Sequence, residues 1–232
     1  MGFPRSLQID KEKLAAAQAT PNHVSIDEMP DYLGQAFVSI EDHRFHRHIG
    51  IDFISLGRAL WIDLVKGGKI QGGSTITMQL ARNLFLTNNK TFSRKIKEIW
   101  IAFYLEWKFS KPEILEMYLN NIYFGHGIYG IETAASFYFG KTTRMDNPNK
   151  EIVSLAEAAM LAALPKAPER YSPVKDFSKA KRRQEIVLKR MLQLGVITKA
   201  EQEAAVKEKI HILGKYSSLY PNKQNRLSIH AS

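Results

Sequence analysis

The sequence predicts an all-α fold. Apolar residues recur at helical spacing along most of the 232 residues, and no stretch alternates apolar and polar side chains over the length of a strand. Signals that start helices stand where the apolar pattern begins. Three Ser or Thr residues are each followed by Glu three positions later, which is the pattern of a capping box. These pairs are Ser110 with Glu113, Ser154 with Glu157, and Thr198 with Glu201.

The first half of the chain is predicted to form helices separated by polar or glycine-rich turns. The first helix carries Phe37 and Ile40 on its apolar face and ends at Glu41. Gly72 and Gly73 predict a turn before the third helix. The four helices span residues 31–41, 53–65, 75–84 and 92–108.

The second half continues the helical pattern. The capping boxes predict helices that begin near residues 111, 155 and 199, and Pro112 suits a first helical turn. Two further helices are predicted over residues 130–139 and 179–194, the second of which ends before Gly195. Loops are predicted over residues 125–130 and 164–173.

Composition restricts the class of protein. At 44% hydrophobic residues the chain can bury a sizeable core. The net charge of +10 favours a polyanionic partner, which includes nucleic acid, anionic lipid and pyrophosphate substrates. The absence of cysteine excludes disulfides and thiolate zinc sites. No segment is apolar enough to span a membrane and the N-terminus lacks a signal-peptide pattern, so we expect any anchor helix to be absent from this chain.

Glu41 is the first candidate catalytic residue. A carboxylate at the edge of an apolar helix face can be partly desolvated, which raises its proton affinity toward that of a general base. For Glu41 alone, a surface glutamate at a helix end is the more common case. His43, His46 and His48 follow, but their spacing does not favour a zinc site.

A cationic region follows between residues 66 and 111, where nine Lys or Arg residues face two Glu. Arg94 and Lys95 lie four and three residues before Glu98, so all three share a helix face. An ordinary solvated salt-bridge ladder would give the same spacing. Clustered cations also suit a reaction with an anionic leaving group, because they stabilise the negative charge that develops on it.

The glycine turn before residue 75 favours an anion site, since glycines allow close approach and a helix N-terminus presents free N–H groups. Thr75, Gln79 and Arg82 then follow along one helix face. A helix cap with an exposed polar stripe is the alternative. The turn lacks the Gly-Lys-Ser/Thr ending of a Walker A loop, which disfavours nucleotide hydrolysis.

Two apolar stripes lie on the neighbouring helices. The stripe over residues 53–65 fits either a buried helix or one that dips into lipid headgroups. On the helix over residues 92–108 we expect core positions. These are Ile99, Trp100, Phe103 and Trp107.

Five short blocks, in order along the chain, resemble the motifs of the family 51 glycosyltransferases. This family contains the peptidoglycan polymerases, found alone or as the N-terminal half of class A penicillin-binding proteins. Five blocks at compatible spacing are much more specific than any one of them. The blocks are Glu41-Asp42-x-x-Phe45-x-x-His48-x-Gly50, Gly72-Gly73-Ser74-Thr75-Ile76-Thr77-x-Gln79-Leu80, Arg94-Lys95-x-x-Glu98, Tyr118-Leu119-Asn120 with Tyr138-Phe139-Gly140-Lys141, and Glu157-Ala158-Ala159 with Tyr171-Ser172-Pro173.

The resemblance implies a lysozyme-like larger helical lobe with a small, membrane-facing jaw that would include residues 53–65. It also implies a peptidoglycan glycosyltransferase domain over residues 24–212, after an N-terminal extension (1–23) and before a polar tail or linker (213–232). The substrates would be lipid II and the growing glycan chain, at the outer face of the bacterial cytoplasmic membrane. Other cell-wall synthesis and division proteins are further expected partners, and nucleic acid is not.

The resemblance also assigns site residues. Glu41 is carried over as the general base, and Glu98 as a second catalytic carboxylate that orients cations or helps to hold a divalent ion such as Mg or Mn. No organic cofactor is implied. Met78 and Arg82 depart from the family, which commonly has Gln and Lys there. The substrate-binding residues carried over are Asp42, His48, Ser74, Thr75, Gln79, Arg82, Lys90, Arg94 and Lys95.

Two alternatives from other classes remain open. A lysozyme-type hydrolase would also use a glutamate, but its uncharged leaving group has no need of the clustered cations. A helical nucleic-acid-binding module could use the basic patch at Lys179, Lys181, Arg182 and Arg183 with Arg190. A solvated helix face is the simpler interpretation of that patch.

Overall fold

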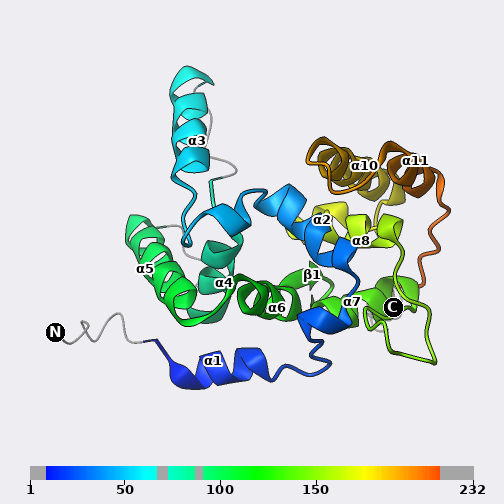
Figure 1. Ribbon diagram of the computed structural model, residues 1–232, viewed down its shortest axis with the longest axis horizontal. Helices are drawn as coiled ribbons and strands as arrows, with labels where there is room; N and C mark the ends of the chain where they lie inside the picture. The colour runs from blue at the N-terminus through cyan, green and yellow to red at the C-terminus, as the bar shows by residue number, and fades with distance from the viewer. Residues whose placement is uncertain (1–8, 67–72, 87–90, 215–232) are drawn as a thin grey trace, which may run out of the picture.

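The computed structural model describes residues 9–66, 73–86 and 91–214, and for residues 59–60, 62–66 and 92 it describes the backbone alone. Within these ranges the chain is mostly helical, with a single two-stranded sheet, which confirms the predicted all-α class. The helices pack into one main body, and α3 projects away from it (Figure 1).

The N-terminal half holds α1 to α5, and its helices begin where the sequence supplies caps. Asp10 caps α1, Thr75 caps α4 and Thr91 caps α5, each through a side-chain oxygen that accepts a backbone N–H bond. Two short 3-10 turns, Ile26–Glu28 and Phe45–Arg47, flank α2. The helices are α1 (Lys11–Gln18), α2 (Asp31–Glu41), α3 (Phe53–Lys66), α4 (Ile76–Phe85) and α5 (Phe92–Lys108).

The C-terminal half contains a hairpin and the remaining helices. All three predicted capping boxes are present, at the starts of α6, α8 and α11. Antiparallel strands β1 (Tyr123–Gly125) and β2 (Ile128–Tyr129) lie between α6 and α7. The helices are α6 (Lys111–Asn121), α7 (Ile131–Phe139), α8 (Leu155–Ala162), α9 (Pro168–Tyr171), α10 (Phe177–Gln193) and α11 (Lys199–Lys207).

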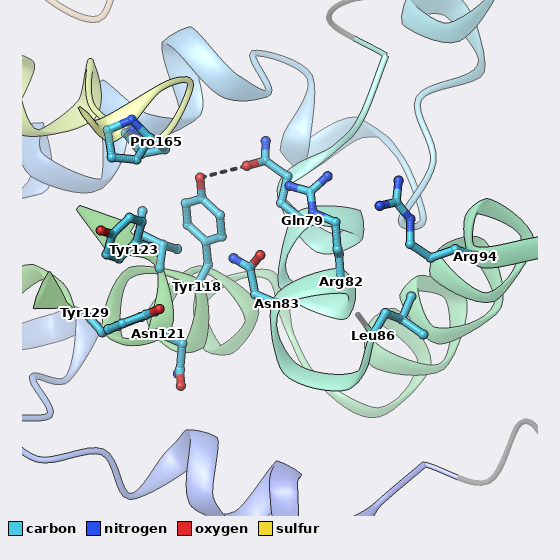
Figure 2. Close-up of a pocket in the computed structure, with 12 residues that line it drawn as sticks. Gln79, Arg82, Asn83, Leu86, Arg94, Tyr118, Asn121, Tyr123, Tyr129 and Pro165 are labelled. Carbon is cyan, nitrogen blue, oxygen red and sulfur yellow. Dashed lines mark hydrogen bonds between the residues drawn. The ribbon is translucent and has the colours of Figure 1, made fainter. Parts of the chain in front are cut away.

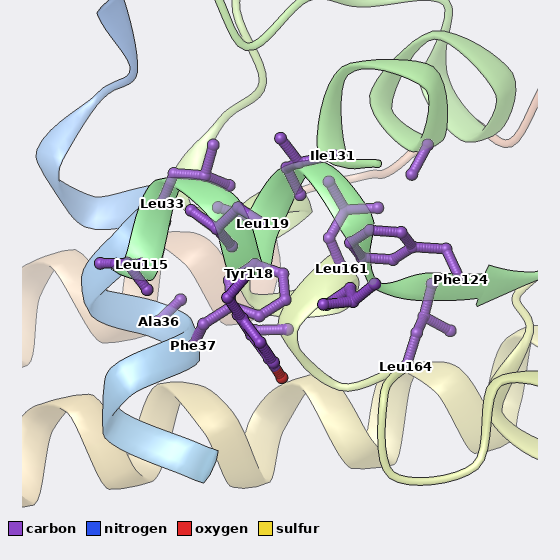
Figure 3. Packing of buried hydrophobic residues seen from close by; sticks show 14 of the residues in the cluster. Leu33, Ala36, Phe37, Leu115, Tyr118, Leu119, Phe124, Ile131, Leu161 and Leu164 are labelled. Carbon is purple, nitrogen blue, oxygen red and sulfur yellow. The ribbon is translucent and has the colours of Figure 1, made fainter. Parts of the chain in front are cut away.

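The core lies where α2, α6 and α8 meet (Figure 3). Phe37 of α2 packs edge-on against Tyr118 of α6 and against Phe124 of β1. α8 is rich in alanine and almost wholly buried, and the small alanine side chains let α2 and α10 approach it closely. This packing fixes the C-terminal end of α2, where Glu41 lies, relative to α6.

The hairpin, α9 and α1 differ from the sequence-based expectations. The hairpin replaces the loop expected at residues 125–130, because Gly125, Gly127 and Gly130 supply positive φ angles for a tight return. The four-residue α9 lies within the loop expected at residues 164–173. In the expected N-terminal extension, α1 buries Leu14 and Ala17 against the body of the fold.

The prediction that Trp100 and Trp107 of α5 belong to the core is wrong. Their side chains are 51% and 82% exposed, and Trp61 of α3 is 69% exposed. Helical periodicity identifies the apolar face of α5, but it does not show what packs against that face. In the described part of the chain, the two tryptophans of α5 remain uncovered. Ile99 and Phe103 are partly buried beside Ala102. None of the helices in the described ranges is both long and apolar enough to cross a bilayer.

Candidate active site

Glu41 lies at the last position of α2 and contacts α4 through Gln79. The amide Nε2 of Gln79 donates a hydrogen bond of 2.8 Å to Glu41 Oε2. The other end of the same amide, Oε1, accepts a bond of 3.3 Å from the hydroxyl of Tyr118 on α6. Three helices that are distant in the sequence therefore meet at this carboxylate.

The surroundings of Glu41 favour its protonated form. Burial raises the pKa of the Glu41 carboxyl above its ordinary value, while the Gln79 hydrogen bond and the positive charges of Arg183, Lys166 and Arg82 oppose the rise. A carboxylate with raised proton affinity is suited to take a proton during a reaction near neutral pH.

Arg183 and Lys166 were not identified as site residues from the sequence. Arg183 belongs to the basic patch on α10, but it follows Ala180 by three residues and precedes Val187 by four, and both of these are buried. That spacing placed it beside the apolar face of α10, where its guanidinium lies 5.7 Å from the ring centre of Tyr171.

The first two motifs are joined by a buried hydrogen-bond network. Asp42 accepts bonds of 3.0 Å from both His48 Nε2 and the backbone N–H of Ile76. Because the N–H of Gly50 donates to His48 Nδ1, the ring proton lies on Nε2 and points at Asp42. The hydroxyl of Thr75 donates to Gly50 O at 2.6 Å. The side chains of Asp42, His48 and Thr75 thus hold the turn before α4 against the segment after α2.

Gly50 lets that segment lie close to α5. Its φ angle is +96°, and a Cβ atom at this position would come within 3.1 Å of the backbone oxygen of Ala102. The first motif therefore needs glycine here both for its conformation and for its contact with the helix that carries the third motif.

Glu98 on α5 is fully buried between two cations. Its Oε1 lies 3.1 Å from Arg94 Nε, and its Oε2 lies 3.1 Å from Lys95 Nζ. Lys95 Nζ also donates to the hydroxyl of Ser74 at 3.1 Å. A carboxylate with no exposed surface is not part of a solvated salt-bridge ladder, which was the alternative interpretation of this spacing. Glu98 instead fixes the two cations beside the glycine turn.

A cavity of about 620 Å³ is lined by one side-chain partner of each carboxylate. Gln79, which bonds Glu41, lines it together with Arg82 and with Arg94, the partner of Glu98. Tyr123 and Tyr129 of the hairpin line the opposite side (Figure 2). The amide that bonds the candidate base and two of the cations therefore line one cavity, which suits a reaction with an anionic leaving group.

The hairpin tyrosines were not among the predicted site residues. Their rings lie 4.9 Å apart, and Tyr123 donates to Glu169 at 2.8 Å. No periodicity marks strands of three and two residues, so only the density of aromatic residues could have indicated them. Lys90, a predicted substrate-binding residue, lies outside the described residues.

The side chains around Glu98 do not suit the divalent cation predicted from the sequence. Both of its oxygens face cationic side chains, an environment that suits Arg and Lys rather than a metal ion. The described part of the chain contains no group of three or more His, Cys, Asp or Glu side chains placed to hold a metal.

Comparison with known proteins identifies the family. A transglycosylase family model matches residues 10–192. Penicillin-binding protein 1F of Bacillus subtilis (strain 168) is 46% identical over 204 residues, which cover 87% of this chain and 26% of that protein. A Cupriavidus necator protein named "Putative transglycosylase H16_A0665" is 44% identical over 201 residues, covering 87% of this chain and 84% of its own length.

The crystal structure of penicillin-binding protein 1A from Haemophilus influenzae also matches, with 25% identity and a TM-score of 0.48, over 84% of this chain and 18% of that one. The chain spans about a quarter of the length of the Bacillus and Aquifex penicillin-binding proteins that it matches. The family resemblance of the five sequence motifs is confirmed: this chain belongs to the transglycosylase family.

Proposed function

We propose that this peptidoglycan glycosyltransferase polymerises lipid II into β-1,4-linked glycan strands, with inversion at the anomeric carbon and release of undecaprenyl pyrophosphate. The observation that carries the proposal is the shared cavity, which brings Arg82, Arg94 and the Gln79 partner of Glu41 together. A base and an anion-binding cluster in one cavity meet the needs of transfer from a pyrophosphate carrier.

Glu41 acts as the general base. Its carboxylate takes the proton of the 4-hydroxyl group on the acceptor sugar, and the resulting oxygen forms a bond to the anomeric carbon of the donor chain. The bond from that carbon to the pyrophosphate oxygen breaks, and its electron pair leaves with the lipid pyrophosphate. Attack and departure on opposite faces invert the anomeric configuration.

Arg82, Arg94 and Lys95 stabilise the negative charge on the departing pyrophosphate. Glu98 contributes by holding Arg94 and Lys95 in place, as the two ion pairs of 3.1 Å suggest. Lys90 is assigned to the same cluster from its sequence position alone. Ser74 and Gln79 line the donor site, while the buried contacts of Asp42, His48 and Thr75 suit them to positioning the glycine turn.

The exposed aromatic residues support a membrane-facing role for α3 and α5. Phe53 and Trp61 on α3 and Trp107 on α5 are each more than half exposed, which is unusual for large apolar side chains unless they meet a partner or lipid. We assign this surface to the outer face of the bacterial cytoplasmic membrane, where lipid II and the growing chain are held. Other cell-wall synthesis and division proteins are proposed as partners there.

Labelled lipid II tests the proposal. Wild-type protein should convert it into a polymer that a muramidase digests, and Glu41→Gln should lose this activity by a hundredfold or more while lipid II binding survives. The matched control is Glu203→Gln, which changes an exposed glutamate of α11 and should polymerise normally. Full polymerisation by Glu41→Gln would remove Glu41 from the reaction.

The same assay separates the alternative functions. Cleavage of finished glycan without polymer synthesis would favour a lysozyme-type hydrolase. Steeply salt-dependent DNA binding without polymerisation would favour a nucleic-acid-binding module. The family match supports neither alternative.

A further inference from the structure

Tyr118 is buried in the core, but its hydroxyl group reaches the active-site cavity. The side chain has no exposed surface, and its ring packs edge-on against Phe37 with 6.4 Å between ring centres. The hydroxyl points away from the apolar cluster (Figure 3) and toward the amide of Gln79 (Figure 2). A polar group is thus fixed by the rigid core at the edge of the candidate active site.

The hydrogen bond from Tyr118 determines which end of the Gln79 amide faces Glu41. The hydroxyl donates to Oε1, so Nε2 points at the carboxylate and donates to it at 2.8 Å. Rotation of the amide by half a turn would place Oε1 against Glu41. That arrangement is repulsive for an ionised carboxylate and favourable for a protonated one, which could donate to Oε1.

We propose that Tyr118 is a positioning residue, which acts through Gln79 to keep Glu41 in the ionised form that can accept the proton of the attacking hydroxyl. The inference rests on the proposed role of Glu41 as the base. The hydroxyl of Tyr118 bonds Gln79 and not Glu41, and Tyr118 has no contact with the reacting atoms in the proposed reaction.

The donor role of Tyr118 persists through the working pH range. Burial, with a further contribution from the negative charge of Glu41, keeps the pKa of the Tyr118 hydroxyl well above its ordinary value. The phenol therefore stays protonated and remains able to donate.

Other charged groups also act on Glu41, and they stay in place when Tyr118 is changed. Arg183 on α10, Lys166 in the loop before α9 and Arg82 on α4 all favour the ionised carboxylate, and Asp42 follows Glu41 in the chain. Replacing Tyr118 with Phe removes the hydroxyl alone and keeps the ring that packs on Phe37. The change in Glu41 can then be assigned to the amide.

The test is the pH profile of kcat/KM for lipid II polymerisation in detergent micelles. Without the Tyr118 hydroxyl, the flipped amide becomes accessible and protonated Glu41 gains stability. For Tyr118→Phe the acid limb should therefore move to higher pH by about half a unit, which is the size expected for one hydrogen bond. The rate at the plateau should remain close to that of the wild type.

A double-mutant cycle tests whether Tyr118 acts through Gln79. Gln79→Met removes the donor to Glu41 and should shift the acid limb in the same direction. Adding Tyr118→Phe to Gln79→Met should cause no further shift. Tyr138→Phe is the matched control, because it removes the hydroxyl of another fully buried tyrosine. That hydroxyl donates to Phe124 O, so its loss should leave the acid limb of the pH profile unchanged.

A lower plateau without a shifted limb would assign Tyr118 a purely structural role and overturn the inference. The inference would also be overturned if the pH profile of Tyr118→Phe had no acid limb or an unshifted one. It would likewise be overturned if the shift of Tyr118→Phe added to that of Gln79→Met in the double variant. Failure of the proposed function is a separate result, since it would appear as polymerisation by Glu41→Gln.

Discussion

Glu41 and Glu98 are two carboxylates whose partners, Gln79 and Arg94, line one cavity, but the surroundings of the two carboxylates differ. Glu41 accepts a hydrogen bond from a neutral amide, and burial raises its pKa. Among the described contacts, no cation forms an ion pair with it. Glu98 has no exposed surface and is paired directly with Arg94 and Lys95. The first environment favours proton exchange, while in the second both carboxylate oxygens are occupied by cations.

Burial alone therefore does not make a carboxylate a base. A buried carboxylate paired with two cations has its oxygens occupied, and removing it leaves positive charge without compensation. A desolvated carboxylate held by one amide keeps an oxygen available for a proton. Two environments for the same chemical group thus separate a reacting residue from an anchoring residue.

The largest expected effect on stability comes from Glu98→Gln. This change removes the charge that compensates Arg94 and Lys95, and we expect the free energy of unfolding to fall by about 2 kcal/mol, less than for a fully buried pair because both cations are partly exposed. Urea denaturation measures it. The exposed pair of Glu203 and Lys199 provides the control, since Glu203→Gln should change stability by less than about 0.5 kcal/mol. Unchanged stability with lost polymerisation would instead make Glu98 a reacting group.

Lys95→Ala should have a smaller effect, and on binding rather than folding. Glu98 keeps Arg94 as a partner, but Ser74 and the proposed pyrophosphate site lose a positive charge. We expect about tenfold weaker binding of a pyrophosphate-containing substrate analogue, the loss typical of one charge-assisted hydrogen bond. Lys97→Ala removes the same charge from the same helix and should bind normally. Equal losses in the two variants would show only a general effect of charge.

The smallest effect is expected for Glu41→Gln on stability. Because the folded state raises the pKa of Glu41, the stabilising contribution of this group is fully present below the ordinary value and is lost as pH rises through the folded value. At neutral pH the ionised wild-type carboxylate therefore costs stability, and Gln, which still accepts from Gln79, avoids that cost. At pH values above the folded-state pKa of Glu41, thermal denaturation should give Glu41→Gln a Tm equal to or higher than that of the wild type. A clearly lower Tm would show that Glu41 holds the fold together.

Much of the fold could be predicted because its signals are local. The predicted bounds of α2 and α5 agree with the structure, and the three capping boxes mark real helix starts. The hairpin was missed because its strands are shorter than any detectable period. The exposure of Trp107 was missed because a pattern locates an apolar face without showing what lies against it.

The site was predictable only in part, because its geometry depends on contacts between distant residues. The motifs supplied Glu41 and Glu98 together with their partners Gln79 and Arg94, and these two partners line one cavity. The bond from Ile76 to Asp42 spans 34 positions, and no spacing rule predicts it. Arg183 of α10 approaches Glu41 through packing of α10 on α2, which is likewise a tertiary contact.

The most direct test is a titration of the Glu41 carboxyl itself by carbon-13 NMR on protein labelled at its glutamate side chains. The signal of Glu41 is assigned by its loss in Glu41→Gln. We predict that Glu41 titrates clearly above the ordinary pKa of glutamate, in the range where the acid limb of polymerisation falls. A Glu41 that titrates at or below the ordinary value would contradict its role as the base.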